Sequence, residues 1–346
     1  MIRFGQRDES LNLDQLFSEG AIKAKALQSL TLDQILSTLH AFGQEWHPGS
    51  KLFEAAMQGL KADLPFSEEM VRLTLGVIPD LLSREALEKR LSGEFHDPRV
   101  LDQFVTAKNG LGRVRAFPGG EMLHVTAGNV FISCIDSLVM GFLTKNVSYL
   151  KLSSKNNFFP FFFAEALIAF DQKKVLADKF SMLIWKGGDQ SIESRFKQHV
   201  PLIIAWGGEE MLESYRQGLG LGTKLLDYGP KISFQMVTKL GIDKLGVIEA
   251  GKRIAQDLVM WDQQACSSPQ NLFVEKGVEI SLLMKAIGAA LDIHPLKRGQ
   301  LSADEQVEIL KERERARVSR SLEHGQSLEG TEWLLHYETR PFLRTS

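Results

Sequence analysis

The stretch that decides the fold is residues 181–208, which reads SMLIWKGGDQSIESRFKQHVPLIIAWGG. Residues 181–186 and 202–206 are short apolar runs of the kind that form buried strands, and residues 192–199 between them are typical of a surface helix. A pair of glycines directly follows each strand, at residues 187–188 and 207–208. Strand, helix and strand at this spacing predict a right-handed crossover and a parallel sheet with both faces covered.

The same alternation continues on both sides of this stretch. We expect further strands at residues 113–117, 121–126, 148–152, 223–228, 232–237 and 271–275, and helices at residues 159–170, 209–217, 244–261, 280–291 and 303–324. The first hundred residues are helical in pattern, with a capping box at Thr31 and Gln34 and a helix end at Gly43. The sequence therefore predicts an α/β protein with parallel-sheet domains at residues 111–230 and 231–346, after a helical region at residues 1–110.

Composition excludes several classes of function. The 346 residues are 44% hydrophobic and 24% charged with a formal net charge of −2, so no overall field attracts nucleic acid or anionic lipid. The N-terminus lacks the features of a signal peptide. The most apolar window, residues 158–170, is interrupted by Pro160 and Glu165 and is shorter than the ~18 residues of a membrane span. With two cysteines, we expect a cytoplasmic protein.

Common catalytic motifs are missing. The sequence has no Gly-x-Gly-x-x-Gly dinucleotide fingerprint, no Gly-x-Ser-x-Gly elbow and no histidine or cysteine spacing typical of a metal site, so we expect no metal. The glycine pairs at residues 187–188 and 207–208 are placed where a ligand could approach backbone N–H groups at the start of a helix. Plain tight turns use the same residues, and this alternative stays open.

The two cysteines differ in their surroundings. Cys134 lies among apolar residues and is expected in the core. Cys266 lies in the polar stretch WDQQACSSPQ, residues 261–270, between a predicted helix and a predicted strand. A thiolate in such a loop can act as a nucleophile. Composition alone still favours an inert cysteine at this position.

Several motifs, in this order, resemble the aldehyde dehydrogenase superfamily. They are Ala127-Gly128-Asn129-Val130, Lys151-Leu152-Ser153-Ser154, Ala205-Trp206-Gly207-Gly208 and Gln264-Ala265-Cys266. The blocks YGPKIS at residues 228–233 and WDQQACSSPQ at residues 261–270 resemble one branch, the LuxC-type acyl-CoA reductases, which are the fatty-acid reductase subunits of bacterial luminescence. The resemblance covers roughly residues 25–340.

The resemblance implies a fold and a set of site residues. The fold would be aldehyde dehydrogenase-like, with the helical region packing on an NAD(P)-binding Rossmann-like domain at residues 111–230 and a catalytic domain at residues 231–346. Cys266 would carry the acyl group as a thioester, and the Asn129 amide and the Cys266 backbone N–H would form the oxyanion hole. The implied cofactor-binding residues are Lys151, Ser153, Ser154, Gly187, Gly207 and Gly208.

The implied reaction is reduction of a fatty acyl-CoA to the aldehyde by NADPH. NADPH is expected because Ser154 stands where NAD-dependent relatives have a ribose-binding glutamate, with Lys155 next to it. Asp227 replaces the glutamate that activates water in acid-forming members, which argues against hydrolysis of the acyl enzyme. The implied partners are an acyl-CoA or acyl-protein thioester, an acyl-protein synthetase and further copies of the chain in a homo-oligomer.

Two alternatives are compatible with the same residues. One is an aldehyde dehydrogenase that oxidises aldehydes to acids. The other is a non-catalytic subunit that accepts acyl groups or binds a partner, because the sequence ends at Ser346, before the C-terminal part typical of the family. We therefore expect a truncated family member whose catalytic domain is incomplete.

Overall fold

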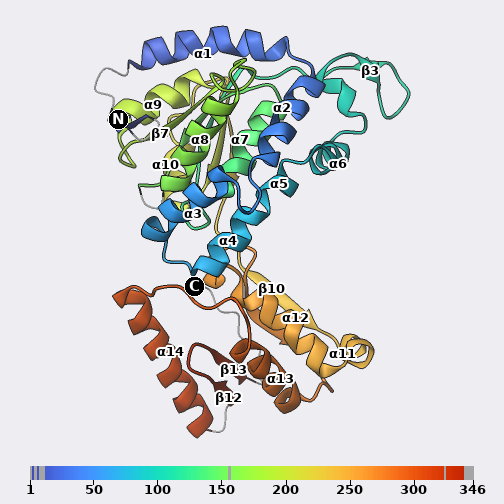
Figure 1. Cartoon of the computed structure of the whole chain (residues 1–346), viewed down its shortest axis with the longest axis vertical. Helices are drawn as coiled ribbons and strands as arrows, with labels where there is room; N and C mark the ends of the chain where they lie inside the picture. The colour runs from blue at the N-terminus through green and yellow to red at the C-terminus, as the bar shows by residue number, and fades with distance from the viewer. Residues whose placement is uncertain (1, 4–5, 8–11, 155–156, 323–324, 339–346) are drawn as a thin grey trace. The chain divides into compact units, whose positions relative to one another are not determined.

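Figure 1 shows the computed structural model of the chain, which describes residues 2–3, 6–7, 12–154, 157–322 and 325–338. The chain divides into two compact units. Unit 1 contains Met1–Leu64 and Arg72–Pro230, and unit 2 contains Pro65–Val71 and Lys231–Ser346. A short segment of the N-terminal helical region, Pro65–Val71, thus belongs to the same unit as the C-terminal part of the chain.

Unit 1 is built on a seven-stranded sheet of order β2-β1-β7-β6-β5-β8-β9. Its strands are β1 (Ile2–Arg3), β2 (Gln6–Arg7), β5 (Glu121–Val125), β6 (Val147–Lys151), β7 (Phe180–Ile184), β8 (Leu202–Trp206) and β9 (Lys224–Tyr228). The strands β5 to β9 are parallel, and β1 pairs antiparallel with β7 at one side. The predicted parallel sheet is confirmed: β8 has the predicted bounds, and the bounds of β5, β6, β7 and β9 differ from prediction by one or two residues.

The winding of this sheet reverses once. From β5 the chain moves outward to β6 and β7, and it then returns to the other side of β5 to form β8 and β9. Because all five strands are parallel, their carboxyl ends lie along one edge of the sheet. In open α/β sheets, ligands bind at this edge, next to the point where the strand order reverses. Here that point lies between β5 and β8.

Helices of unit 1 pack on the sheet and on one another. Those of the N-terminal region are α1 (Leu13–Gln28), α2 (Leu32–Gln44), α3 (Lys51–Asp63), α4 (Glu68–Gly76), α5 (Ile78–Leu81), α6 (Arg84–Glu94) and the 3-10 turn η1 (Pro98–Leu101). The helices between the strands are α7 (Ser133–Leu143), α8 (Phe158–Phe170), α9 (Gln190–His199) and α10 (Glu209–Arg216), and a small ladder joins β3 (Val105–Thr106) to β4 (Arg113–Val114).

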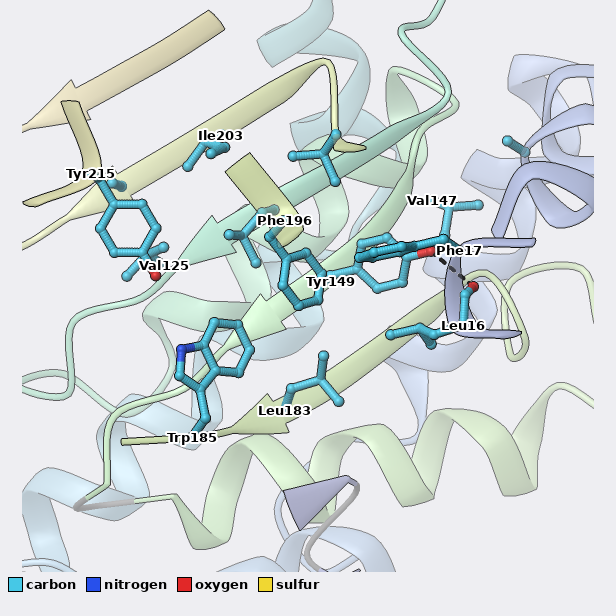
Figure 2. Packing of buried hydrophobic residues seen from close by; sticks show 14 of the residues in the cluster. Leu16, Phe17, Val125, Val147, Tyr149, Leu183, Trp185, Phe196, Ile203 and Tyr215 are labelled. Atoms are coloured by element: carbon cyan, nitrogen blue, oxygen red, sulfur yellow. Dashed lines mark hydrogen bonds between the residues drawn. The ribbon is translucent and has the colours of Figure 1, made fainter. Parts of the chain in front are cut away.

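Aromatic rings form much of the core of unit 1. Phe196 of α9 stacks on Trp185 with ring centroids 5.3 Å apart and meets Tyr149 of β6 edge to face at 5.5 Å (Figure 2). Phe17 of α1 meets the Phe196 ring edge to face, with ring centroids 5.1 Å apart. Because these side chains are almost fully buried, they fix α1 and α9 to the sheet through the hydrophobic effect.

The capping box predicted at Thr31 and Gln34 lies at the start of α2. Gln34 N donates to Thr31 Oγ1 (3.2 Å) and Thr31 N donates to Gln34 Oε1 (2.8 Å), so the capping box of α2 is confirmed. The prediction that Gly43 ends this helix is wrong, because α2 continues to Gln44. A Cβ at Gly43 would lie 2.7 Å from the Cβ of Leu82, so the glycine allows close helix packing and does not mark a helix end.

Unit 2 contains a separate sheet of two parallel strands, β10 (Ser233–Val237) and β11 (Pro269–Val274). Its other elements are α11 (Lys239–Leu245), α12 (Val247–Val259), the 3-10 turn η2 (Met260–Gln263), α13 (Ile280–Asp292), α14 (Ala303–Ser321) and the antiparallel hairpin β12 (Gly325–Glu329) and β13 (Leu334–Glu338). The long helix predicted at residues 244–261 is instead two helices, since the backbone turns at Gly246 with φ of 78°. In the part of the chain that the structure describes, no helix is long and apolar enough to cross a membrane.

Candidate active site

Seven of the eight predicted site residues follow the carboxyl ends of strands in unit 1. They are Asn129 after β5, Lys151, Ser153 and Ser154 at the end of β6, Gly187 after β7, and Gly207 and Gly208 after β8. Backbone hydrogen bonds tie these ends together: Thr126 N donates to Lys151 O (3.0 Å), and Leu152 N donates to Leu183 O (2.9 Å). The seven residues therefore lie along one edge of the sheet, on both sides of the reversal between β5 and β8.

Lys151 is a cation at this edge. It is the last residue of β6 and is half-buried. Burial lowers the pKa of Lys151, while the nearby carboxylate of Glu193 acts in the opposite direction. Ser153 is half-buried and Ser154 is exposed. Lys155, which the sequence placed beside them as a second cation, lies outside the described residues.

The turn between β7 and α9 is held by a buried carboxylate. Gly188 has φ of 80°, and its N–H donates to Glu193 Oε1 at 3.0 Å. The indole N–H of Trp185 donates to the same oxygen at 3.4 Å. Glu193 is only 1% exposed, and its Oε2 has no hydrogen-bond partner among the described residues. Burial, followed by the Glu193 charge, raises the pKa of the Tyr215 hydroxyl.

Glu193 is not among the site residues predicted from the sequence. A carboxylate in the first turn of a helix is common, because it interacts favourably with the helix dipole. Burial is what distinguishes Glu193, and that burial results from packing of α9 on the sheet through Phe196. A weak signal does exist in the sequence, since Glu193 lies three residues before Phe196 and therefore on the apolar side of α9.

Three of the four glycines leave room for a ligand, whereas a Cβ at Gly207 would lie 2.3 Å from Met211 Cε. A Cβ at Gly187, Gly188 or Gly208 would meet no described atom within 4 Å. Gly208 is the N-cap of α10, and no described side chain accepts a hydrogen bond from the first turn of that helix. The start of α9, by contrast, is capped by a side chain, because Ser191 N donates a hydrogen bond to Asp189 Oδ1 at 3.1 Å. The first turn of α10 also carries the carboxylates of Glu209 and Glu210, so an anionic group at Gly208 would meet these two negative charges as well as the backbone N–H groups.

Asn129 and Cys134 lie close in sequence but in different environments. Asn129 is exposed, in the turn between β5 and α7. Cys134 is buried in the first turn of α7, where its thiol donates to Phe131 O at 3.6 Å. Burial raises the pKa of Cys134 to about 12, so its thiol stays protonated near neutral pH. Cys134 is therefore a core residue, as predicted.

Cys266 lies in unit 2, in the turn between η2 and β11, and its side chain is exposed. Its carbonyl oxygen accepts a hydrogen bond from Ser233 Oγ at 2.6 Å, which joins the turn to the start of β10. The residues on either side of the turn are buried, Ala265 before it and Ser268 after it. The backbone around the thiol is therefore fixed while the sulfur remains accessible, which suits a nucleophile.

The backbone just before Cys266 is strained. Trp261, Asp262 and Gln263 have φ of 51°, 50° and 61°, which is the left-handed region. For L-residues this conformation costs about 1–2 kcal/mol each and is rare in consecutive residues. Such strain persists where surrounding contacts impose it, and it is frequent at functional sites. The sequence WDQ at residues 261–263 does not predict this turn, because it contains neither glycine nor proline.

Asp227 is engaged by a neighbouring helix. It lies in β9, and its Oδ2 accepts a hydrogen bond from Arg216 Nε of α10 at 3.1 Å. An open cavity of about 560 Å³ lies beside this pair and is lined by Glu209, Glu210 and Glu213. The described residues contain no group of three or more His, Cys, Asp or Glu side chains that could hold a metal ion.

The chain is similar to proteins of one family. The acyl-CoA reductase (LuxC) family matches over residues 27–344. The long-chain acyl-protein thioester reductase of Photorhabdus luminescens is 28% identical over 247 residues, which are 70% of this chain and 50% of the relative. The long-chain acyl-protein thioester reductase 2 of Photobacterium leiognathi is 26% identical over 350 residues, 96% of this chain and 70% of the relative. The chain thus spans about half the length of the first of these relatives.

Among solved structures, the NAD-dependent benzaldehyde dehydrogenase of Corynebacterium glutamicum aligns with a TM-score of 0.68. The alignment covers 94% of this chain and 70% of the other at 14% identity. An identity this low shows the fold alone. The predicted aldehyde dehydrogenase-like fold is confirmed.

Proposed function

Because this chain belongs to the LuxC family of acyl-CoA reductases, we propose that it reduces a fatty acyl thioester to the aldehyde with NADPH as the hydride donor. The observation that carries the proposal is Cys266, the exposed one of the two cysteines, fixed by its backbone in the motif that resembles the family's nucleophile. The acyl donor is a CoA thioester or an acyl-protein, as the names of the relatives suggest.

The chemistry assigned to Cys266 is covalent catalysis. The thiolate attacks the thioester carbonyl, the C–S bond to CoA breaks, and CoA leaves as its thiol after taking a proton. NADPH, when held at the sheet edge by residues that include Lys151 and Gly208, would supply the hydride that reduces the acyl carbon. Hydride addition leaves an alkoxide on the tetrahedral carbon. Its C–S bond to Cys266 then breaks, so the aldehyde leaves and the Cys266 thiolate is restored. Covalent capture divides the reduction into two easier steps and retains the acyl group meanwhile.

Oxyanion stabilisation is assigned to two donors by resemblance, the Asn129 side-chain amide and the Cys266 backbone N–H. A tetrahedral intermediate carries negative charge on the former carbonyl oxygen, and preorganised N–H donors stabilise that charge. Asn129 is exposed and follows β5, next to the reversal of the sheet. This placement supports the assignment of Asn129 to a ligand-binding edge.

The cofactor is proposed to bind along the sheet edge of unit 1. Gly187 and Gly208 would let the pyrophosphate approach backbone N–H groups, and Lys151 would contact the adenosine ribose. Gly207 would lie beside the pyrophosphate, with its own N–H bonded to Tyr228 O at 3.3 Å. Ser153 and Ser154 follow Lys151 and offer hydroxyl donors. NADPH is preferred over NADH in this proposal because Ser154, unlike a carboxylate, does not repel a 2′-phosphate. Glu193 does not replace the missing carboxylate, since it is buried beneath the turn.

The alternative of an acid-forming aldehyde dehydrogenase has less support. Such an enzyme needs a carboxylate free to activate water. Asp227, which stands at that position by resemblance, accepts a hydrogen bond from Arg216 at 3.1 Å. The shorter side chain and this ion pair both argue against a role as the base. The non-catalytic alternative predicts acyl transfer to the chain without oxidation of NADPH.

A coupled assay tests the proposal. Incubation with tetradecanoyl-CoA and NADPH should release CoA, aldehyde and NADP⁺ in equal amounts. Cys266→Ala should abolish all three products, while Cys134→Ser should retain them provided that it folds. Acid formed from tetradecanal without CoA would favour the aldehyde dehydrogenase. CoA release without NADPH oxidation would favour the non-catalytic acyl acceptor.

A further inference from the structure

We propose that Asp262 is a positioning residue for Cys266, which holds the left-handed turn that presents the nucleophile and its backbone N–H. The inference rests on the proposed function of Cys266 and adds a role to a residue that sequence analysis left without one. Asp262 is four residues before Cys266, in the middle of the three consecutive residues with positive φ. All the contacts involved lie within unit 2.

The Asp262 carboxylate connects the turn to a distant loop. Its Oδ2 accepts a hydrogen bond from Gly299 N at 3.0 Å. The same loop is bonded on its other side, because Gln300 N donates to Pro65 O at 2.6 Å. Gly299 fits tightly here, since a Cβ would lie 1.8 Å from Pro65 O. Segments around residues 65, 262 and 299 are thus joined, and the loop that holds Asp262 cannot shift independently.

The residues next to Asp262 close the turn on itself. Gln263 Nε2 donates to Pro269 O and Gln270 Nε2 donates to Gln263 O, each at 3.1 Å. Ser268 Oγ donates to Met260 O at 3.2 Å. These three bonds cross from one side of Cys266 to the other. Together with the bond from Ser233 Oγ to the Cys266 carbonyl, they determine where the Cys266 peptide points.

Asp262 has the chemistry for this position. Short polar side chains tolerate positive φ better than others, and a carboxylate accepts strongly from a backbone N–H. Its partial burial raises the pKa, and the Gly299 hydrogen bond acts against that rise. A buried carboxyl group is costly without such a partner. The bond to Gly299 therefore does two things: it satisfies the carboxylate and fixes the strained backbone.

Two substitutions separate the hydrogen bond from the backbone conformation. Asp262→Asn keeps an acceptor oxygen and tolerance of positive φ. Asp262→Gly permits the same φ but has no acceptor, so it removes the bond to Gly299 without adding strain. Gln270→Leu is a second variant, which removes the donor to Gln263 O and leaves the φ angles of residues 261–263 to the remaining contacts.

The readout is the rate of acyl-adduct formation on Cys266 from tetradecanoyl-CoA, followed by intact mass. Iodoacetamide alkylation of the same thiol is measured in parallel, because alkylation requires an accessible sulfur but no oxyanion donor. We expect Asp262→Gly to slow acylation by about tenfold, the effect of one charge-assisted hydrogen bond. Alkylation should stay near the wild-type rate, Asp262→Asn should acylate nearly normally, and Gln270→Leu should slow acylation in the same direction.

The outcomes distinguish the inference from the proposed function. A wild-type chain that takes no acyl group on Cys266 refutes the proposed function, and the inference with it. If the wild type is acylated and Asp262→Gly reacts equally fast, the inference alone is wrong. Parallel losses of acylation, alkylation and melting temperature in Asp262→Gly would also overturn it, because they would show a merely structural role. If Asp262→Gly does not fold, an unchanged acylation rate in Gln270→Leu refutes the proposal.

Discussion

Replacing Glu193 with alanine should weaken both the fold of unit 1 and its affinity for NADPH. The side chain is 1% exposed, and its Oε1 accepts from Gly188 N at 3.0 Å and Trp185 Nε1 at 3.4 Å. Glu193→Ala leaves the buried indole N–H without this acceptor, at about 1–3 kcal/mol, and removes the bond that holds the glycine turn, at about 0.5–1.5 kcal/mol. The substitution also removes Oε2, a buried oxygen without a hydrogen-bond partner among the described residues, and this offsets part of the lost stability. We therefore expect a net destabilisation of about 2 kcal/mol.

Two measurements follow from these magnitudes. For a domain of this size, about 2 kcal/mol lowers the melting temperature by roughly 4–8 °C. The loosened Gly187-Gly188 turn should raise the Kd of NADPH, measured by calorimetric titration, by roughly threefold to tenfold. Removing Glu193 also removes the interaction that raises the pKa of Lys151. The variant should therefore lose NADPH affinity at a lower pH than the wild type as the pH is raised and Lys151 deprotonates.

Two control variants make the result specific. Glu165→Ala changes an exposed glutamate of α8 and should alter stability by no more than about 0.5 kcal/mol. Glu193→Gln retains an acceptor oxygen without the charge, so it should keep most of the stability but show the shifted pH dependence. The reasoning is refuted if Glu193→Ala melts within about 1 °C of the wild type or binds NADPH with unchanged affinity.

Three further predictions concern single residues. Burial lowers the pKa of His124 from 6.5 to about 3, so protons bind the unfolded chain more readily, and stability should fall as the pH drops from 6.5 toward 3, by up to about 1.4 kcal/mol per pH unit for this group. Denaturant melts of His124→Gln should show a weaker pH dependence, and an unchanged slope would count against this assignment. Ser154→Glu should shift the ratio of NADH to NADPH affinity toward NADH by about tenfold or more, whereas equal wild-type Kd values for the two cofactors would contradict the proposed preference. Asp227→Asn should leave the yield of free fatty acid from the acyl enzyme unchanged, because Arg216 already holds the carboxylate; a marked fall in acid, quantified by chromatography, would identify Asp227 as a base.

The sheet of unit 1 could be predicted from sequence because its signals are local. The strand at residues 202–206 is an apolar run bounded by Pro201 and a glycine pair, and these features fix both of its ends. The capping box of α2 is likewise contained in four consecutive residues. The edge that gathers Asn129, Lys151 and the glycines then follows from the parallel direction of the strands.

The features that were missed depend on contacts between distant segments. Gly246 divides a predicted helix because the chain turns there with positive φ, which a helical pattern on both sides conceals. The hairpin of β12 and β13 was not predicted, since its strands GQSLE and LLHYE are short and lack a regular alternation. In the left-handed turn at residues 261–263, Asp262 accepts a hydrogen bond from Gly299 N, 37 residues away in sequence. Such bonds leave no local pattern.

The measurement that tests the central claim most directly is the mass of the protein after incubation with a long-chain acyl-CoA in the absence of NADPH. We predict that the wild type and Cys134→Ser each gain one acyl group, and that peptide mapping places it on Cys266, because this thiol is exposed while burial raises the pKa of Cys134 to about 12. Cys266→Ala should gain none. An adduct of the same mass on Cys266→Ala, or none on the wild type, would contradict the assignment of Cys266 as the nucleophile.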